Sequence, residues 1–204
     1  MIYVVSGPSG CGKSTLIRRV MARLEGVRFS VSHTTRERRK SEVDGRDYFF
    51  VTRERFLRMV EKDAFVEWAV VHGAFYGTSR KELERSGGRD VILDIDVQGA
   101  AQVKTTVRGA VFIFVLPPSF RALRKRLEER GLDGAAAVRK RLAAARKEIR
   151  SVDLFDYVVV NDDLTAAVRE LESILRCRRA SLAARGKSLA PILKSFRGKG
   201  GVKP

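Results

Sequence analysis

The feature that most constrains this chain is a glycine-rich segment close to its N-terminus. Residues 7–14 match the pattern G-x-x-x-x-G-K-[ST] in full, with Thr15 next. An apolar run at Ile2–Val5 precedes the segment, and helically spaced apolar residues over Ser14–Glu25 follow it. In such a strand–loop–helix context, glycines let backbone N–H groups converge on phosphate oxygens, and the helix start adds positive potential. The segment predicts a phosphate-binding loop for a nucleoside triphosphate.

Two side chains of the loop carry expected roles in phosphoryl chemistry. Lys13 supplies a mobile cation to the transferring phosphoryl group, and the Ser14 hydroxyl is a ligand for Mg²⁺. Cys11 lies next to a helix N-terminus, which lowers a thiol pKa, so it is expected to be an alkylation site rather than a catalyst. The residues expected to hold the phosphates of the nucleoside triphosphate, ATP or GTP, are Gly7, Pro8, Ser9, Gly10, Cys11, Gly12, Lys13, Ser14 and Thr15.

Short apolar runs alternate with helical patterns along the chain. Runs of this kind indicate strands buried on both faces of a parallel sheet. They are Ile2–Val5, Val91–Ile95, Val111–Leu116 and Tyr157–Val160, with a weaker run at Val27–Val31. Helical spacing occupies Ser14–Glu25, Phe120–Arg130 and Leu164–Arg185. The alternation predicts an α/β fold, a P-loop NTPase-type parallel sheet flanked by helices.

Two regions interrupt this alternation. Residues 33–85 are polar and aromatic-rich and predict an inserted mixed α/β lobe, with strands near Asp47–Val51 and Phe65–Val71 and a helix near Arg53–Glu61. Residues 121–150, rich in Arg and Ala, predict a helical segment that either packs loosely or moves, as a helical lid does. The predicted core is 1–32, 86–120 and 151–185, followed by a basic C-terminal tail at 186–204.

The charge is unevenly distributed. Lys+Arg 41 and Asp+Glu 24 give a net charge of +17, and residues 176–204 hold nine basic residues and no acid, which leaves +8 for the rest. Basic surfaces attract polyanions. The tail therefore either binds RNA or membrane phosphates or only solubilises the end of the chain. Its single aromatic residue, Phe196, argues against a base-stacking binder.

Cysteine usage and hydropathy favour a cytoplasmic protein. The two cysteines, Cys11 and Cys177, cannot build a disulfide framework. No basic segment precedes Ile2–Val5, so a secretory signal is not expected. No uncharged run approaches the roughly 18 residues of a membrane span. We expect no membrane partner and a monomer or small homo-oligomer.

Acidic and basic side chains beyond the loop indicate a second substrate. Asp94 ends an apolar strand and Asp96 follows on the same side, where either is able to serve Mg²⁺ or a substrate group. The segment 32–39 gathers hydroxyls and guanidiniums that suit a phosphate dianion. A buried carboxylate suits guanine, because guanine offers N1–H and N2–H donors together whereas adenine has no N1–H. A site of that kind discriminates by roughly 10⁴ or more.

At these residues the sequence resembles the guanylate kinase family. The shared pattern runs from Ser6 to Asp163, about four-fifths of the chain. Its pieces are the P-loop, Ser32-x-Thr34-Thr35-Arg36, Glu42-x-x-Gly45-x-Asp47-Tyr48, Glu67-Trp68, Tyr76-Gly77-Thr78 and Leu93-Asp94-Ile95-Asp96. The resemblance implies ATP-dependent phosphorylation of GMP, and dGMP as a further candidate acceptor, to the diphosphate with release of ADP and with Mg²⁺, in purine nucleotide metabolism.

The resemblance also implies roles for individual residues. Arg36, Arg39, Tyr48 and Tyr76 hold the GMP phosphate, and Ser32, Glu67 and Thr78 contact the guanine. The full set implied for GMP is Ser32, Arg36, Arg39, Tyr48, Glu67, Tyr76, Thr78, Asp94 and Asp96. The set implied for transfer is Lys13, Arg39, Arg130 and Arg141, and the metal set is Ser14 and Asp94.

Three departures from the family pattern leave alternatives open. Arg38 stands where a proline is common, so either Arg38 or Arg39 faces the phosphate. Ser41 replaces a usual glycine, and Thr78 stands where serine is frequent. Two rival functions are a non-catalytic guanylate-kinase-like module that binds proteins and a basic P-loop protein that binds nucleic acid. Such modules typically lose P-loop or lid residues that this chain keeps.

Overall fold

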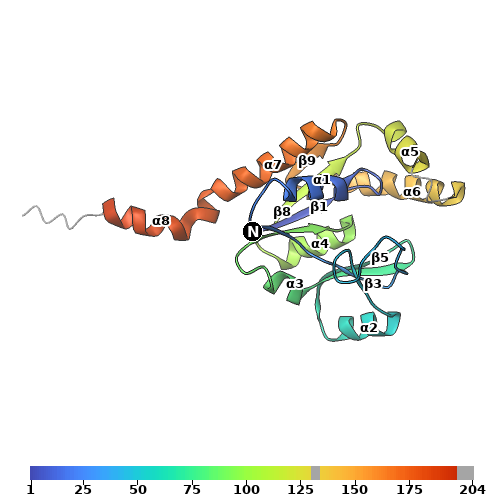
Figure 1. The fold of residues 1–204 in the computed structure, drawn as a ribbon, viewed down its shortest axis with the longest axis horizontal. Helices are drawn as coiled ribbons and strands as arrows, with labels where there is room; N and C mark the ends of the chain where they lie inside the picture. The colour runs from blue at the N-terminus through green and yellow to red at the C-terminus, as the bar shows by residue number, and fades with distance from the viewer. Residues whose placement is uncertain (130–133, 197–204) are drawn as a thin grey trace, which may run out of the picture.

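The computed structural model describes residues 1–129 and 134–196 (Figure 1). The elements in chain order are β1 (Ile2–Ser6), α1 (Lys13–Met21), β2 (Val27–Phe29), β3 (His33–Thr34), β4 (Phe49–Phe50), α2 (Arg53–Glu61), β5 (Phe65–Val71), β6 (Ala74–Ser79), α3 (Arg80–Glu84), β7 (Asp90–Asp94), α4 (Val97–Thr106), β8 (Val111–Leu116), α5 (Phe120–Glu129), α6 (Ala135–Glu148), the 3₁₀ helix η1 (Ile149–Leu154), β9 (Tyr157–Val160), α7 (Leu164–Ala180) and α8 (Leu182–Phe196).

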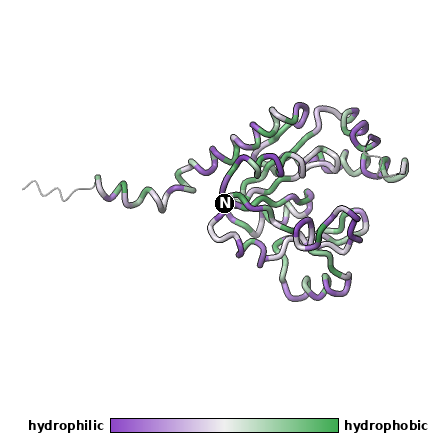
Figure 2. The backbone as a smooth tube through the Cα atoms, viewed as in Figure 1, coloured by the Kyte–Doolittle hydropathy of each residue, from purple (hydrophilic) through white to green (hydrophobic). Residues whose placement is uncertain are grey.

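A five-stranded sheet forms the centre of the molecule, and its strand pairs are all parallel. The strand order is β2-β7-β1-β8-β9. Helices α1 and α7 pack through apolar residues on one face, and α4 packs on the other, so the middle strands are buried from both sides. Figure 2 shows hydrophobic residues concentrated along these strands. The predicted α/β fold with a parallel central sheet is confirmed. Strand β2, predicted as the weaker apolar run Val27–Val31, ends at Phe29.

The inserted region forms a second, four-stranded sheet with the order β4-β3-β6-β5. Strands β3 and β4 are parallel, whereas β3–β6 and β5–β6 are antiparallel. Phe56 of α2 stacks on Phe65 at 4.5 Å between ring centroids and packs with Phe75, which gives this sheet its own small core. Strand β4 covers only Phe49–Phe50, less than the predicted Asp47–Val51.

Helices α5 and α6 form a third packing unit. Leu123 and Leu127 of α5 meet Val138, Leu142 and Ala145 of α6 in a cluster separate from the cores of the two sheets. The two helices therefore share an apolar cluster of their own, in which Leu123 and Leu127 are fully buried. Figure 1 shows them on the same side of the molecule as the inserted sheet.

The C-terminal helical pattern is divided into two helices, so the predicted single helix over Leu164–Arg185 is wrong. Helix α7 ends at Ala180, Ser181 is extended (φ −62°, ψ 149°), and α8 begins at Leu182. The Ser181 hydroxyl accepts a hydrogen bond from the backbone N–H of Ala184 at 3.3 Å, so serine acts as the N-cap of a new helix. Most of the predicted basic tail is therefore helical up to Phe196.

No helix within residues 1–129 and 134–196 combines the length and the apolar content that crossing a bilayer requires.

Candidate active site

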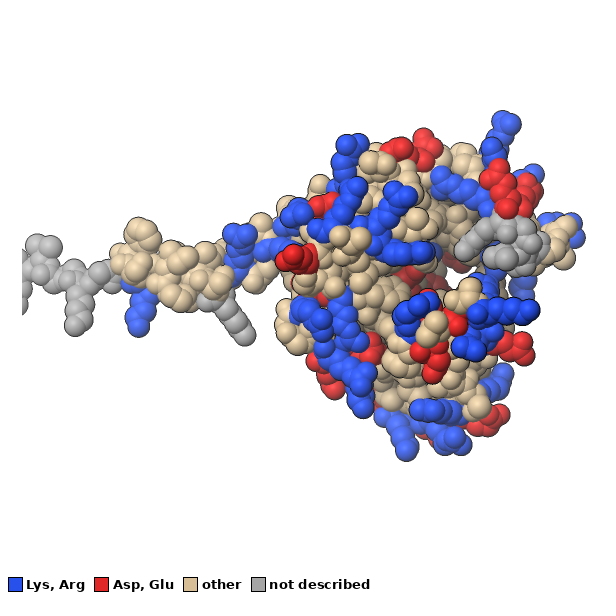
Figure 3. All heavy atoms as spheres, viewed as in Figure 1, with Lys and Arg blue, Asp and Glu red and all other residues tan. Residues whose placement is uncertain are grey.

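A cavity of about 640 Å³ lies where the three packing units meet. Its walls come from the loop after β1, the carboxyl end of β7, the inserted sheet and the helices α5 and α6. Figure 3 shows the molecule hollowed between the inserted sheet and these helices, with Lys and Arg side chains along the rim. In an open parallel sheet this is where ligands bind, at the carboxyl ends of the strands.

The loop between β1 and α1 curls around the ammonium group of Lys13. Its Nζ donates to the carbonyl oxygens of Gly7 (2.6 Å) and Pro8 (3.4 Å) at the cavity wall. Gly12 has a φ of 96°, and a Cβ there would lie 2.3 Å from Nδ2 of Asn161. The same Nδ2 donates to the Cys11 carbonyl at 2.7 Å, so Asn161 fixes the loop from the end of β9.

Asn161 was not predicted as a functional residue. It lies directly after β9, an edge strand that was predicted to be buried on both faces but exposes Val158 and Val160. The contact with Cys11 joins residues 150 positions apart, which no local pattern reveals.

The expected alkylation site at Cys11 is wrong. Its side chain is fully buried, and burial raises the pKa of its thiol although Lys13 opposes the shift. The proximity of a helix N-terminus is outweighed by the loss of solvent. Cys11 therefore contributes packing and a carbonyl acceptor rather than a reactive sulfur.

Ser14 and Asp94 place two oxygens together at the bottom of the cavity. The Ser14 hydroxyl donates to Oδ2 of Asp94 at 3.0 Å. Burial raises the pKa of Asp94, while the charge of Lys13 and the Ser14 hydrogen bond oppose the rise. A hydroxyl and a carboxylate are ligands that Mg²⁺ accepts, with water and substrate phosphates as the remaining ligands. Consistent with so few protein ligands, the described residues contain no cluster of three or more His, Cys, Asp or Glu side chains suited to a metal.

Asp96 has a different position. Its Oδ1 accepts from the backbone N–H of Gly99 and its Oδ2 accepts from Nε2 of Gln98, both at 2.9 Å, so it caps α4. Both carboxylates line the cavity, but Asp94 faces Ser14 whereas Asp96 accepts hydrogen bonds from its own helix, and this geometry favours Asp94 for the metal.

A cluster of donors lies on the inserted sheet across the cavity from the loop. Arg36 Nε donates to the Tyr76 hydroxyl at 3.2 Å, and its guanidinium carbon lies 5.5 Å from the ring centre of Tyr48. Burial raises the pKa of Tyr48 to about 12, so its hydroxyl stays a donor. Glu42 Oε1 accepts from Arg36 Nη2 at 2.7 Å. Burial acts against ionisation of Glu42, but the hydrogen bonds from Arg36 and Arg39 hold its pKa below the usual value.

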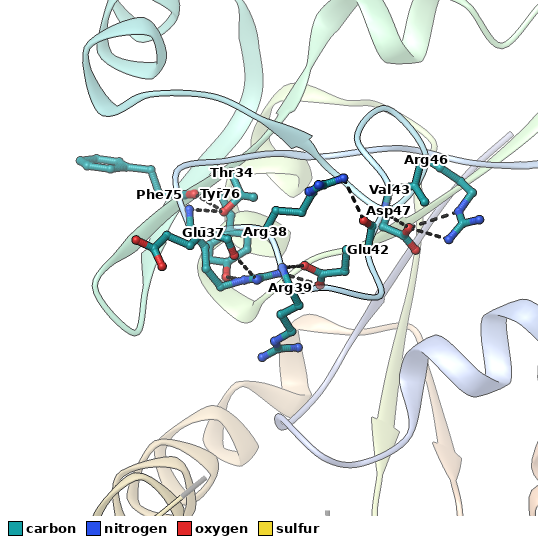
Figure 4. A network of polar contacts seen from close by, with 11 residues as sticks. Thr34, Glu37, Arg38, Arg39, Glu42, Val43, Arg46, Asp47, Phe75 and Tyr76 are labelled. Carbon is teal, nitrogen blue, oxygen red and sulfur yellow. Dashed lines mark hydrogen bonds and ion pairs between the residues drawn. The ribbon is translucent and has the colours of Figure 1, made fainter. Parts of the chain in front are cut away.

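The structure separates the two neighbouring arginines that the sequence left open. The backbone N–H of Arg39 donates to Oε2 of Glu42 at 2.9 Å, and the Arg39 side chain lines the cavity. Arg38 Nη1 instead lies 3.4 Å from the Glu42 carbonyl oxygen. Figure 4 shows the two side chains pointing in opposite directions. Arg39 is therefore the arginine that joins Arg36 at the cavity.

A buried carboxylate lies beside this cluster. Glu67 is only 3% exposed, and its Oε1 accepts from the backbone N–H of Thr78 at 2.8 Å. Burial raises the pKa of Glu67 to about 7. The hydrogen bond from Thr78 opposes this rise, and the negative charge of Asp96 adds to it. Ser32 also lines the cavity, whereas Thr78 is fully buried behind the cavity wall.

Gly99 of α4 makes room for this carboxylate. A Cβ at Gly99 would lie 2.3 Å from Oε2 of Glu67. Any larger residue must displace the Glu67 side chain or the helix. Gly99 was not predicted from the sequence, because a glycine inside a helix carries no signal of which side chain approaches it.

The helices α5 and α6 contribute charged groups to the opposite wall. Arg141 lines the cavity, whereas Arg130 lies outside the described residues. Two further residues of these helices line the cavity and were not predicted, Arg126 and Glu148. The Nη2 of Arg126 donates to the carbonyl oxygen of Asn161 at 2.8 Å. Burial raises the pKa of Glu148, while Lys13 and the N–H of Ser9 oppose the rise. In an Arg-rich helix nothing local distinguishes Arg126 from its neighbours.

The chain is similar to known proteins over most of its length. The family model described as "Guanylate kinase" matches residues 1–178. The guanylate kinase of Thermotoga maritima is 50% identical over 183 residues, which cover 89% of this chain and 88% of the relative. That of Thiobacillus denitrificans is 44% identical and covers 97% of this chain and 95% of the relative. The crystal structure of guanylate kinase from Anaplasma phagocytophilum superposes with a TM-score of 0.73 at 35% identity, covering 89% of this chain and 86% of that one.

Proposed function

The chain belongs to the guanylate kinase family, and from that membership we propose that the cavity transfers the γ-phosphoryl group of ATP to GMP. The protein is a nucleoside monophosphate kinase that forms GDP and ADP. The observation that carries the residue assignment is the placement of Glu67. A buried carboxylate lies beside an Arg–Tyr cluster and across the cavity from a phosphate-binding loop.

Glu67 selects the base. Its carboxylate accepts from N1–H and N2–H of guanine, and Ser32 lies beside it at the cavity wall. Against adenine the same carboxylate faces an acceptor and stays unpaired in a buried site, which costs far more than a lost surface hydrogen bond. Thr78 supports this contact indirectly by fixing the orientation of Glu67.

The Arg–Tyr cluster binds the acceptor phosphate. Arg36, Arg39, Tyr48 and Tyr76 present guanidinium and hydroxyl donors to a dianion, and Glu42 holds the two arginines in place. Charge-assisted hydrogen bonds of this type are short and roughly twice as strong as neutral ones. The phosphate is thereby oriented toward the loop at the other wall.

Transfer itself needs positioning and charge neutralisation rather than a dedicated base. An oxygen of the GMP phosphate forms a bond to the γ-phosphorus as the bond to the β–γ bridging oxygen breaks, and ADP leaves with that oxygen. Lys13 and Arg141 lie at the cavity wall, where their charges offset those of the clustered phosphates. Backbone N–H groups of the loop, which every residue from 7 to 15 except Pro8 carries, hold the phosphates of the donor.

Ser14 and Asp94 would hold Mg²⁺, as their paired oxygens suit it. When bound, Mg²⁺ neutralises charge on the β- and γ-phosphates. Asp94 also orients the Ser14 hydroxyl, which donates to its Oδ2.

Three separate cores favour a protein that closes in parts. We assign residues 33–85 to a GMP lobe and 121–150 to a lid, each able to move on the parallel-sheet core because each has its own apolar cluster. Closure of both parts on the two nucleotides excludes water and prevents plain hydrolysis of ATP.

The test is ADP formation by the purified chain with Mg-ATP and GMP, dGMP, AMP, UMP or no acceptor. Turnover with GMP and its deoxy analogue alone supports the assignment, with Lys13→Ala as the inactive control. Turnover only with another acceptor would overturn the role of Glu67. Binding of GMP without turnover would instead favour a non-catalytic module of the same family.

A further inference from the structure

Helix α8 lies outside every part of the protein that the kinase reaction uses. The family model ends at residue 178, before α8 begins at Leu182. Figure 1 shows α8 extending past the end of α7, away from the central sheet and at the opposite end of the molecule from α5, α6 and the inserted sheet. It contributes no residue to the cavity described above. A helix in this position needs another partner for its apolar residues.

Four large apolar residues of α8 form one stripe, and Ile192 lies beside it. Leu182, Leu189, Leu193 and Phe196 are spaced by seven, four and three residues, which places them on the same face of a helix with 3.6 residues per turn. Leu182 is 73% exposed, Leu193 54% and Phe196 85%. Contiguous exposure of this kind on a soluble chain marks an interaction surface.

The charge of the same region restricts the partner. Residues 182–204 contain Arg185, Lys187, Lys194, Arg197, Lys199 and Lys203 and no acid. Within α8, Arg185 lies next to the apolar stripe, and Lys194 lies about 100° further round the helix from Leu193. A partner must therefore present negative charge next to an apolar phase.

We infer that α8 lies on an anionic lipid surface, with its leucine and phenylalanine stripe in the acyl boundary and its basic residues at the headgroups. Basic amphipathic helices bind in the plane of the interface by adding apolar burial to electrostatic attraction. At 15 residues α8 is too short to span a bilayer. The sequence left membrane phosphates open as a partner of the basic tail but predicted no membrane partner for the protein, and the inference takes the former alternative.

Charge and hydropathy disfavour the other occupants. A second copy would bring an equally basic α8 against the first, so like charges would oppose the contact. RNA would satisfy the basic residues but leave the stripe in water, because phosphates gain nothing from leucine. Only a surface that is both anionic and apolar accounts for the two features together.

The test compares two charge-matched double variants of the full chain. Leu193→Glu with Phe196→Glu places two acids on the stripe, and Ser188→Glu with Ser195→Glu places two acids on another face of α8. All four positions are exposed and lie outside the cavity, so both variants should fold and keep the kinase activity of the parent. Binding is measured by co-sedimentation with vesicles of pure phosphatidylcholine or of phosphatidylcholine mixed with phosphatidylglycerol.

We expect the parent chain to bind the vesicles that contain phosphatidylglycerol and not those of pure phosphatidylcholine. The stripe variant should lose at least about tenfold more affinity than the serine variant, because it also loses the burial of two large apolar side chains. Equal losses would show a purely electrostatic contact and overturn the inference, as would no binding to anionic vesicles. A dimer in sedimentation velocity that only the stripe variant abolishes would assign the stripe to a second copy instead.

Discussion

At the scale of single residues, the site depends on a carboxylate kept in an unusual environment. Glu67 is nearly inaccessible to solvent and has no cation hydrogen-bonded to it among the described residues, only the N–H of Thr78 and the nearby charge of Asp96. Such a group ionises at a higher pH than an exposed glutamate does. Its protonation state should therefore be visible in the binding of the base.

We predict that the KM for GMP depends on pH with a midpoint near 7. Guanine binding requires the ionised form, so KM should rise as the pH falls through about 7, the pKa of Glu67. Initial-rate measurements between pH 5.5 and 8.5 provide the test. The variant Glu67→Gln keeps the titration of the GMP phosphate and should lack this dependence; an unchanged profile in the variant would contradict the assignment. The free energy of unfolding should change in the opposite direction with pH. Because the carboxyl pKa of Glu67 is higher in the folded chain, stability falls as the pH rises from 4.5 to about 7.

We predict that Gly99→Ala weakens GMP binding without weakening the fold. The new methyl group collides with Oε2 of Glu67, so the KM for GMP should rise about tenfold while that for ATP stays unchanged. Alanine is the better helix former, so the melting temperature should not fall. Gly186→Ala, where a Cβ meets nothing within 4 Å, is the matched control. Equal kinetics in the two variants would show that Glu67 adapts freely.

Some residues of the site follow from the sequence and others do not. The phosphate-binding loop and Asp94 lie in local patterns whose chemistry is specific, whereas Arg36, Tyr48 and Glu67 were assigned from the resemblance to a family. The fold brings these three residues, Asp94 and most of the loop to one cavity. Arg126, Glu148 and Asn161 act through contacts between distant segments. Only the folded chain brings these side chains to the loop, so no local pattern distinguishes them.

At the scale of elements, strand prediction succeeded where burial produces a continuous apolar run. Strands β1, β7 and β8 of the central sheet are of this kind, and their predicted bounds differ from the observed ones by at most one residue at either end. Strand β3 has only two residues, and its partner β6 does not contain a continuous apolar run. Neither strand was therefore predicted. Helix α4 was also missed, although Asp96 caps it through the N–H of Gly99.

The lid provides a prediction about transfer rather than binding. Arg141→Ala should lower kcat by about a hundredfold or more, because it removes one charge from the phosphates in the transition state, and should change the KM for GMP little. Arg139→Ala, on the same helix but exposed and outside the cavity, should stay within about twofold of the parent. Similar kcat values for the two variants would remove Arg141 from the proposed machinery.

At the scale of the whole molecule, Asp90 joins segments that are far apart in the chain. Its two oxygens accept from the N-terminal ammonium and from Nε of Arg179, both at 2.6 Å. Asp90 thus ties the start of β7 to the end of α7 and to residue 1. Asp90 does not line the active-site cavity, so its ion pairs contribute to stability and not to catalysis.

We predict that Asp90→Asn lowers the free energy of unfolding by about 2 kcal/mol, since it leaves two partly buried cations with a neutral partner. For a domain of this size the melting temperature should fall by about 4–8 °C. Asp63→Asn, which breaks a surface pair with Arg80, should cost less than about 1 kcal/mol. Thermal unfolding at neutral pH measures both. A loss for Asp90→Asn no larger than for the control would contradict the role of Asp90.

The central claim is that Glu67 makes this kinase select guanine. It is tested most directly by kcat/KM for GMP and AMP, measured side by side in the parent chain and in Glu67→Gln. The account predicts a preference for GMP of about 10⁴ or more in the parent and a loss of most of it in the variant, through a fall in the value for GMP. A preference that survives the substitution, or a parent chain that favours AMP, would contradict it.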